Sequence, residues 1–208
     1  MQIDVISLGP MDNCTYLISE GTTALLIDPA WDMNFLEHTL TQKKLTLAGV
    51  FFTHGHFDHV KFAQQLLQKT GLKGYIEEKD IPLCGIDPKF LHPYSGKQQL
   101  TVSPFEITII PTPGHTAGSV CILLADALFT GDTLFPGACG RVDLPTSSPR
   151  AMRQSLAKLG HLPQDTRIFA GHSYGGKCSS TIGYERVKNP FMRNALRDEE
   201  KLHASHID

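Results

Sequence analysis

The sequence has no closely spaced cysteine pair and no long hydrophobic run, and its first residues do not have the pattern of a signal peptide. Its five cysteines include no C-x-x-C pair, and their odd number argues against a disulfide framework. The N-terminal segment MQIDVISLGPMDNCTYLI lacks both the basic region and the uninterrupted apolar core of a signal peptide. No apolar stretch is long enough to span a bilayer. These features predict a cytoplasmic protein that does not act at a membrane.

The chain also carries little net charge. Its formal charge is −2 at pH 7, and 41% of its 208 residues are hydrophobic. A chain without a strong positive charge does not attract polyanions, so nucleic acid is not an expected partner. The length suits one core, and no linker, internal repeat or low-complexity block divides it. We therefore expect a single domain over residues 1–208, whose oligomeric state the sequence does not indicate.

Hydrophobic patterning predicts strands interrupted by helices, which is typical of a layered α/β sandwich. Strands are expected at Gln2–Leu8, Cys14–Ile18, Ala24–Ile27, Leu45–Phe52, Gly74–Ile76, Phe105–Ile110, Ser119–Leu124, Ala127–Phe129 and Arg167–Ala170. Helices are expected at Met33–Lys44, Phe57–Thr70 and about Pro149–Leu159. The proline-containing stretch Asp80–Leu100 is expected to be a surface loop, and the polar segment after His172 is expected to be a tail.

The segment Thr53-His54-Gly55-His56-Phe57-Asp58-His59 joins a buried strand to a helix. His54 and His56 share one side of an extended chain, so their imidazoles can converge on one ion. Asp58 and His59 lie at the start of the helix, where its N-terminus also favours a carboxylate. A solvated polar turn is the alternative. Three histidines and an aspartate in six residues, however, make a poor core and a good metal site.

Three further polar residues follow apolar strands, namely His115 after FEITIIPT, Asp132 after ALFT and His172 after RIFA. A glycine lies directly before each of them and allows the backbone to approach an ion closely. Each residue alone is more typical of an ordinary surface or core position. Together with the first segment they supply five imidazoles and two carboxylates, enough for two coordination shells. Nitrogen and oxygen ligands without thiolate suit zinc, iron or manganese and do not select among them.

The blocks THGHFDH, PGHTAGS, TGDTLF and GHSYGG occur in the order found in the metallo-β-lactamase superfamily, and the chain resembles its glyoxalase II-like branch over nearly its whole length. The resemblance implies a four-layer αββα sandwich. It implies that one metal is bound by His54, His56 and His115. A second metal would be bound by Asp58, His59 and His172, with Asp132 bridging the two. Two zinc ions are the expected cofactors, with iron or manganese as alternatives.

Two such ions would lower the pKa of a shared water from about 16 toward about 7 and so supply hydroxide at neutral pH. We expect this hydroxide to attack a thioester, with Asp58 and Asp132 as the catalytic carboxylates. Tyr174 matches a tyrosine near the substrate of glyoxalase II-like enzymes, although a packed aromatic is the alternative. Arg141 lies in a loop close to Asp132, where an Arg–Asp pair that holds the loop is favoured over substrate contact. Lys177 faces either the pocket or water.

Three functions stay open. The first is hydrolysis of a small-molecule or carrier-protein thioester, as by hydroxyacylglutathione hydrolases or thioesterases of polyketide pathways. The second follows from GACGRVDLPTSSP and GHSYGGKCSSTIGYERVKNPF, which also resemble persulfide dioxygenases; there, the equivalents of His54, His115 and Asp132 hold a single iron. The third is a non-enzymatic binding module in which the metal ions serve only to hold the structure together. The glyoxalase II resemblance is incomplete, since we expect only a short tail where that enzyme has a glutathione-binding helical domain.

Overall fold

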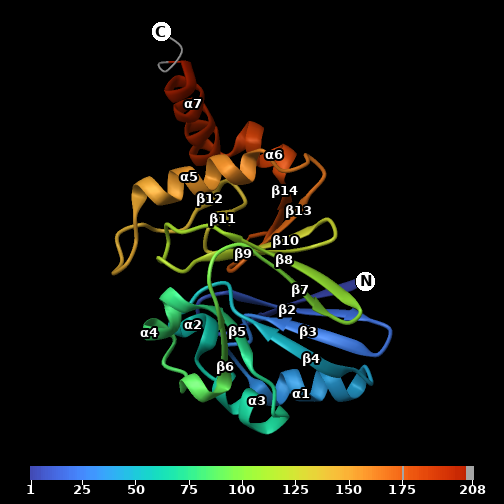
Figure 1. Ribbon diagram of the computed structural model, residues 1–208. Helices are drawn as coiled ribbons and strands as arrows, with labels where there is room; N and C mark the ends of the chain where they lie inside the picture. The colour runs from blue at the N-terminus through green and yellow to red at the C-terminus, as the bar shows by residue number, and fades with distance from the viewer. Residues whose placement is uncertain (175, 205–208) are drawn as a thin grey trace.

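A computed structural model, which describes residues 1–174 and 176–204, shows two six-stranded mixed sheets packed face to face (Figure 1). The first sheet has the order β1 (Gln2–Leu8), β2 (Asn13–Glu20), β3 (Thr23–Ile27), β4 (Thr46–Phe51), β5 (Gly74–Glu77) and β6 (Leu91–Tyr94). The second has the order β14 (Ser179–Thr181), β13 (Arg167–Ala170), β10 (Ala127–Gly131), β9 (Val120–Leu124), β8 (Phe105–Pro111) and β7 (Gln98–Val102). A hairpin of β11 (Leu134–Phe135) and β12 (Ala138–Cys139) lies beside the second sheet.

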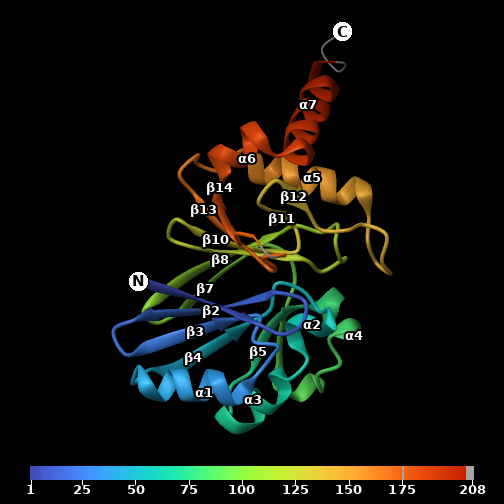
Figure 2. The same ribbon diagram turned by 180° about the vertical axis from the view of Figure 1, so that it is seen from behind.

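Helices cover the outer face of each sheet (Figure 2). The first sheet is covered by α1 (Met33–Gln42) and α3 (Ala63–Thr70), and the second by α5 (Pro149–Gly160), α6 (Ile182–Lys188) and α7 (Pro190–Ala204). The expected four-layer αββα sandwich is therefore confirmed. Shorter helices are α2 (Phe57–Val60), α4 (Ile81–Cys84) and the 3-10 turns Glu78–Asp80 and Pro88–Phe90. Within the described residues, no helix combines the length and apolar character needed to cross a membrane.

Three apolar layers hold the sandwich together. Tyr16, Phe51 and Phe129 belong to the layer between the two sheets, and all three are nearly inaccessible to solvent. A second layer lies under α1 and α3, and a third lies under α5, α6 and α7. Complete burial of one such side chain stabilises a fold by roughly 1.5–3 kcal/mol, so these layers supply the main favourable contribution to folding.

Local signals set the helix boundaries. Asp32 accepts a hydrogen bond from the backbone N–H of Phe35 at the start of α1. Ser148 caps α5 in the same way, directly before a proline in the first turn. Gly71 ends α3 with a φ of 72°, a conformation that a side chain would oppose. The start and stop residues in the sequence therefore mark these helices correctly.

The prediction of one continuous helix over Phe57–Thr70 is wrong, because the structure has two helices there, α2 and α3, separated by residues 61 and 62. The backbone N–H of Phe62 donates to the carbonyl of Ala30, 3.2 Å away, instead of to its own helix. The break leaves α2 as a single turn that carries Asp58 and His59. The direction of these two side chains is thus independent of the longer helix that follows.

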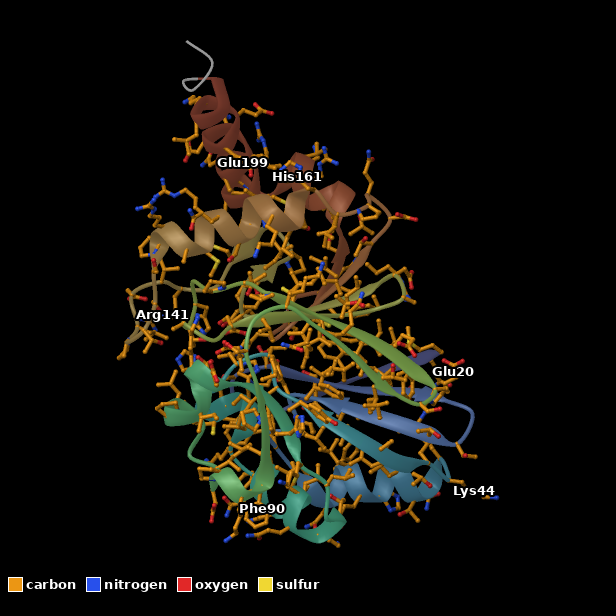
Figure 3. All side chains as sticks on the ribbon, in the orientation of Figure 1. Glu20, Lys44, Phe90, Arg141, His161 and Glu199 are labelled. Atoms are coloured by element: carbon orange, nitrogen blue, oxygen red, sulfur yellow. The ribbon has the colours of Figure 1, made fainter. Side chains whose placement is uncertain are left out.

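The expectation that two segments lack regular structure is wrong for both of them. Residues 80–100 contain β6 and the start of β7, and Asp80 within them is fully buried. The segment after His172 forms β14, α6 and α7, which complete the outer layer of the second sheet. The physical reason is a narrow apolar stripe in which Ile182, Met192 and Ala195 pack against α5. An ion pair of 2.7 Å between His161 and Glu199 also joins α5 to α7 (Figure 3).

Candidate metal centre

The predicted ligand residues meet at one edge of the sandwich, where strands of both sheets end. The chain leaves β4 directly into residues 53–59, whereas β10 and β13 deliver Asp132 and His172. Hydrogen bonds join these ends across the sheets: the Val120 N–H donates to the Thr53 carbonyl at 2.9 Å, and the Gly171 N–H donates to the Gly131 carbonyl at 2.8 Å. The backbone thus fixes the strand ends relative to one another before any ion is considered.

The side chains form two groups of three. In the first group, the ligand atoms of His54, His56 and His115 all lie within 4.8 Å of one another, and His56 Nδ1 is 2.9 Å from His115 Nε2. The second group consists of Asp58, His59 and His172, and its ligand atoms meet the same limit. The Nε2 atoms of His59 and His172 are 3.2 Å apart there. Each group has the convergence that a single ion requires.

Asp132 lies between the two groups. Its Oδ2 atom is 3.4 Å from the Nε2 atoms of both His115 and His172, which belong to different groups. Its Oδ1 atom is 3.4 Å from His59 Nε2. One carboxylate therefore reaches both halves of the cluster, and all seven side chains singled out in the sequence come together.

Two buried polar atoms of the cluster have no partner among the described residues. His54 Nε2 and Asp132 Oδ1 make no hydrogen bond, although the two residues are only 1% and 8% exposed. A buried polar atom without a partner costs about 1–3 kcal/mol. A cation between them would satisfy both atoms, so the residues present fit a divalent metal.

The outward-facing nitrogens of three imidazoles are held by hydrogen bonds. The Nδ1 atoms of His115 and His172 contact the backbone carbonyls of Arg141 and Met11 at 2.9 and 2.8 Å, respectively. His59 Nδ1 contacts an Asp28 carboxylate oxygen at 2.9 Å. Partners of this kind fix the tautomer and orientation of an imidazole, and they leave Nε2 free to face the cluster.

Two buried carboxylates support the cluster, and the sequence analysis did not identify either. Asp28 accepts hydrogen bonds from the backbone N–H and the hydroxyl of Thr53, in addition to its contact with His59. Asp80 accepts hydrogen bonds from the N–H groups of Gly55 and Gly118 and from the Thr116 hydroxyl. Asp28 directly follows an apolar strand and could have been recognised by that signal. Asp80 lies in a segment without periodicity and offers no such signal.

Neighbouring charges and hydrogen bonds shift the pKa values of the cluster residues. Burial by itself raises the pKa of Asp58, but hydrogen bonds from His172 and Asn13 and the nearby His59 outweigh it and lower the pKa to about 2. Burial lowers the pKa of His172, but its hydrogen bonds with Asp132 and Asp58 raise it to about 9. Without metal, the cluster therefore keeps its carboxylates ionised and a proton on His172 at neutral pH.

Two glycines allow the close approach that the sequence predicts. A Cβ atom on Gly131, whose φ is 47°, would lie 2.3 Å from Thr53 Oγ1. A Cβ atom on Gly171 would lie 2.3 Å from Asp132 Oδ1. Both distances are shorter than any non-bonded contact, so only glycine fits at these strand ends.

The cluster opens into a cavity of about 580 Å³. Tyr174 lines this cavity and stacks on His172, with ring centroids 4.9 Å apart and planes 9° apart. Arg141 also lines it, but its guanidinium pairs with Asp143 at 2.7 and 2.8 Å and not with Asp132. An Arg–Asp pair is therefore present in this loop, between Arg141 and Asp143, while the backbone carbonyl of Arg141 contacts His115. Lys177 does not line this cavity and belongs to a separate hollow beside β14.

An αββα sandwich with a histidine- and aspartate-rich cluster at its edge defines a class of metal-dependent hydrolases, and comparison with known proteins places the chain in that class. The family model of the metallo-beta-lactamase superfamily matches residues 9–172, and the chain belongs to this superfamily. The probable polyketide biosynthesis zinc-dependent hydrolase BaeB of Bacillus velezensis is 33% identical over 168 residues, which cover 79% of this chain and 75% of the relative.

Two further similarities support the predicted branch. The hydroxyacylglutathione hydrolase of Shewanella halifaxensis is 38% identical over 161 residues, which cover 74% of this chain but only 58% of the relative. The crystal structure of ETHE1 from Myxococcus xanthus superposes with a TM-score of 0.83 at 27% identity, covering 94% of this chain and 88% of that one. The expected resemblance to the glyoxalase II-like branch is confirmed.

Proposed function

We propose that the protein hydrolyses thioesters with two metal ions held by the seven clustered side chains. The observation that carries this proposal is the position of Asp132, whose oxygens lie 3.4 Å from imidazoles of both three-residue groups. A carboxylate shared in this way suits a pair of ions. One ion would be held by His54, His56 and His115, and the other by Asp58, His59 and His172. Zinc is the proposed metal, and the same ligands would also accept iron or manganese.

When bound, the ions would supply a hydroxide at neutral pH and polarise the substrate carbonyl. Asp58 faces the cavity and stays ionised, so it can ligate one ion and orient the attacking hydroxide. Asn13 fixes this carboxylate, since its side-chain N–H groups donate to Asp58 Oδ2 at 3.0 Å and to the Asp58 carbonyl at 3.1 Å. The exposed ring of Tyr174 and the neighbouring Phe135 would form an apolar wall for the acyl group.

A thioester is the proposed bond because two relatives carry the names of a polyketide biosynthesis hydrolase and a hydroxyacylglutathione hydrolase. The substrate would be a small-molecule or carrier-bound thioester. Arg141 and Tyr174 are the proposed substrate contacts, since both line the cavity at the cluster. Lys177 lies outside that lining and has no part in the proposal.

A mononuclear-iron persulfide dioxygenase is the second candidate. The observation that favours it is that the two buried atoms without partners, His54 Nε2 and Asp132 Oδ1, belong to residues that the resemblance assigns to a single iron. The third such residue, His115, lies 3.4 Å from Asp132. One ion bound by these three residues would satisfy both unpaired atoms without the second group.

Metal analysis combined with two substrate panels tests the proposal. We expect two metal ions per chain and turnover of thioesters. In the His59→Ala variant we expect one ion and at least a tenfold lower kcat. One iron per chain, with oxygen consumption on a persulfide, would support the dioxygenase instead. Full thioesterase activity with a single ion would contradict the two-ion mechanism, and no turnover in either panel would support a non-enzymatic module.

A further inference from the structure

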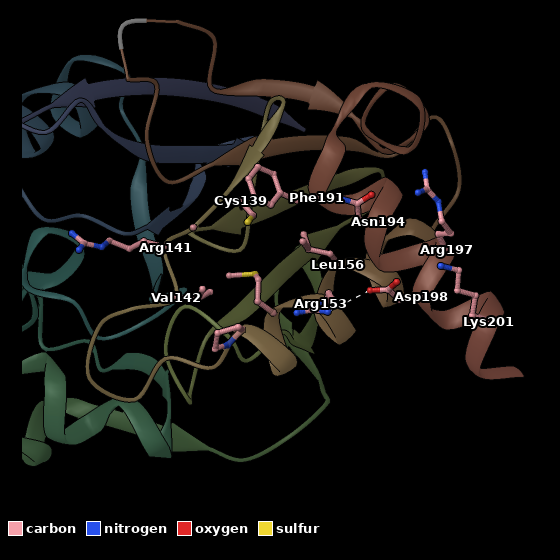
Figure 4. Close-up of a pocket in the computed structure, with 13 residues that line it drawn as sticks. Cys139, Arg141, Val142, Arg153, Leu156, Phe191, Asn194, Arg197, Asp198 and Lys201 are labelled. Carbon is pink, nitrogen blue, oxygen red and sulfur yellow. Dashed lines mark hydrogen bonds and ion pairs between the residues drawn. The ribbon is translucent and has the colours of Figure 1, made fainter. Parts of the chain in front are cut away.

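A second cavity of about 610 Å³ lies beside the first, between the β11–β12 hairpin, α5 and α7 (Figure 4). Its apolar part is formed by Cys139 of the hairpin, Met152 and Leu156 of α5, and Phe191 of α7. Phe191 is 49% exposed, although it is a large aromatic residue. Phe191 is thus an exposed aromatic side chain beside an apolar floor formed by Met152 and Leu156, which are themselves nearly buried.

The two cavities share one wall. Cys139, Gly140 and Arg141 line both the cavity at the ligand cluster and the second cavity. Gly140 packs so closely against the Asp132 backbone that a Cβ atom there would lie 1.8 Å from the Asp132 carbonyl oxygen. The wall therefore carries no side chain at its centre. A long substrate whose reacting bond lies at the cluster can pass over Gly140 into the second cavity.

The second cavity has more cationic than acidic side chains in its lining, although the protein has a net charge of −2 and Arg141 is paired with Asp143. Its lining includes Arg141, Arg153, Arg197 and Lys201 but only one acidic residue, Asp198, which pairs with Arg153 at 3.4 Å. Arg197 and Lys201 are one helical turn apart on α7 and have no ion-pair partner among the side chains described, those of residues 1–174 and 176–202. Figure 4 shows both at the end of the cavity opposite Arg141. Two free cations therefore lie beyond an apolar floor.

We infer that this second cavity binds the thiol half of the substrate as a phosphorylated pantetheine arm, with Arg197 and Lys201 at the phosphate. The inference rests on the proposed thioester hydrolysis. The pantetheine chain is long and uncharged, and its methylene and methyl groups suit the apolar floor of a cavity that shares Cys139, Gly140 and Arg141 with the first. Its phosphate is a compact multivalent anion, which arginine and lysine bind through charge-assisted hydrogen bonds. Coenzyme A and acyl carrier proteins both present this group.

A comparison of matched thioesters tests the inference. The same acyl group is presented on pantetheine and on 4′-phosphopantetheine, and kcat/KM is measured for the wild type. We expect the phosphorylated substrate to be preferred about tenfold or more, mostly through KM. The Arg197→Ala/Lys201→Ala variant should lose this preference and keep its activity on acyl-pantetheine. Both residues are exposed on a helix, and alanine favours that helix, so the variant should fold.

The control variant Arg186→Ala/Lys188→Ala removes the same two types of charge from exposed positions on α6 that do not line the second cavity. It should retain the preference for phosphate. Acyl-coenzyme A and an acyl carrier protein are tested as two further substrates. The higher kcat/KM identifies which of these two carriers of the phosphopantetheine group the enzyme prefers. If the Arg197/Lys201 variant lowers kcat/KM for both carriers, the phosphate is what the cavity recognises.

Failure of the inference can be distinguished from failure of the proposed function. If acyl-pantetheine and its phosphorylated form are cleaved equally well, the inference is overturned while thioester hydrolysis stands. If no thioester is cleaved, the proposed function fails, and calorimetric titration with coenzyme A still tests the cavity. Binding that the Arg197/Lys201 variant weakens about tenfold supports the site, and the absence of binding overturns it.

Discussion

Replacement of Asp80 by asparagine should weaken one metal site and spare the other. Asp80 is fully buried, and its carboxylate accepts hydrogen bonds from Gly55 N–H at 2.8 Å, Thr116 Oγ1 at 2.7 Å and Gly118 N–H at 2.8 Å. These donors flank His56 and His115, which belong to the first group of ligands. The carboxylate therefore ties together the two loops that would converge on the first proposed ion, and none of its hydrogen bonds among the described residues goes to the second group.

The expected loss follows from the hydrogen bonds. Oδ2 of Asp80 accepts from Gly55 and Thr116, whereas Oδ1 accepts from Gly118 alone. Asparagine keeps one side-chain oxygen. The fewest hydrogen bonds are lost if this oxygen faces the Gly55 N–H and the Thr116 hydroxyl, and the NH2 group then faces the Gly118 N–H. A buried donor without a partner costs about 1–3 kcal/mol. Since 1.4 kcal/mol is a factor of ten, we expect binding at the first site to weaken about 10–100-fold, which is typical for loss of an outer partner.

Competition of zinc with a chromophoric chelator, on metal-free protein, would resolve the two binding steps. Asp28→Asn is the matched control, because Asp28 holds His59 of the second group and Thr53 in the same manner. Asp80→Asn should weaken one step and Asp28→Asn mainly the other, whereas urea unfolding of the metal-free variants measures any general loss of stability. The reasoning is refuted if each variant weakens both steps equally, or if Asp80→Asn leaves both steps unchanged.

Three further variants probe the surroundings of the cluster. Tyr16→Phe removes a hydroxyl that donates to the Ala170 carbonyl at 2.5 Å across the two sheets. The free energy of unfolding, measured in urea, should fall by about 1–3 kcal/mol. An unchanged free energy of unfolding would show that this hydrogen bond does not stabilise the fold. Gly171→Ala would place a Cβ atom 2.3 Å from Asp132 Oδ1, so metal analysis should find less than the wild-type content. In metal-free protein, burial lowers the pKa of His172, but hydrogen bonds with carboxylate neighbours raise it from 6.5 to about 9. The protonated imidazole should therefore stabilise the fold fully below about pH 6.5 and lose this effect as the pH rises through 9, so Tm should fall over that interval and His172→Gln should flatten the curve.

The positions of the seven ligand-type residues could be predicted because each follows an apolar strand or begins the next helix. Strands that run side by side and end at one edge bring such residues together, regardless of the conformation of the loops that connect them. The partners of these residues could not be predicted in the same way. Asp28 and Asp80 each lie 25 residues from the loop that they hold, at Thr53 and Gly55 respectively. Nothing in the local sequence shows which backbone N–H groups a buried carboxylate will meet.

The segment after His172 shows a different limit of sequence analysis. Its composition is polar, and only a few positions such as Met192 and Ala195 face the second sheet and its helices, so the apolar stripe is hidden by the charged residues between. Two of those charged residues, Arg197 and Lys201, line the cavity that we propose for the thiol half of the substrate. The proposed chemistry depends on residues that buried strands position. Recognition depends on a cavity that three separate segments build, and its apolar floor and cations meet only when α7 packs on α5.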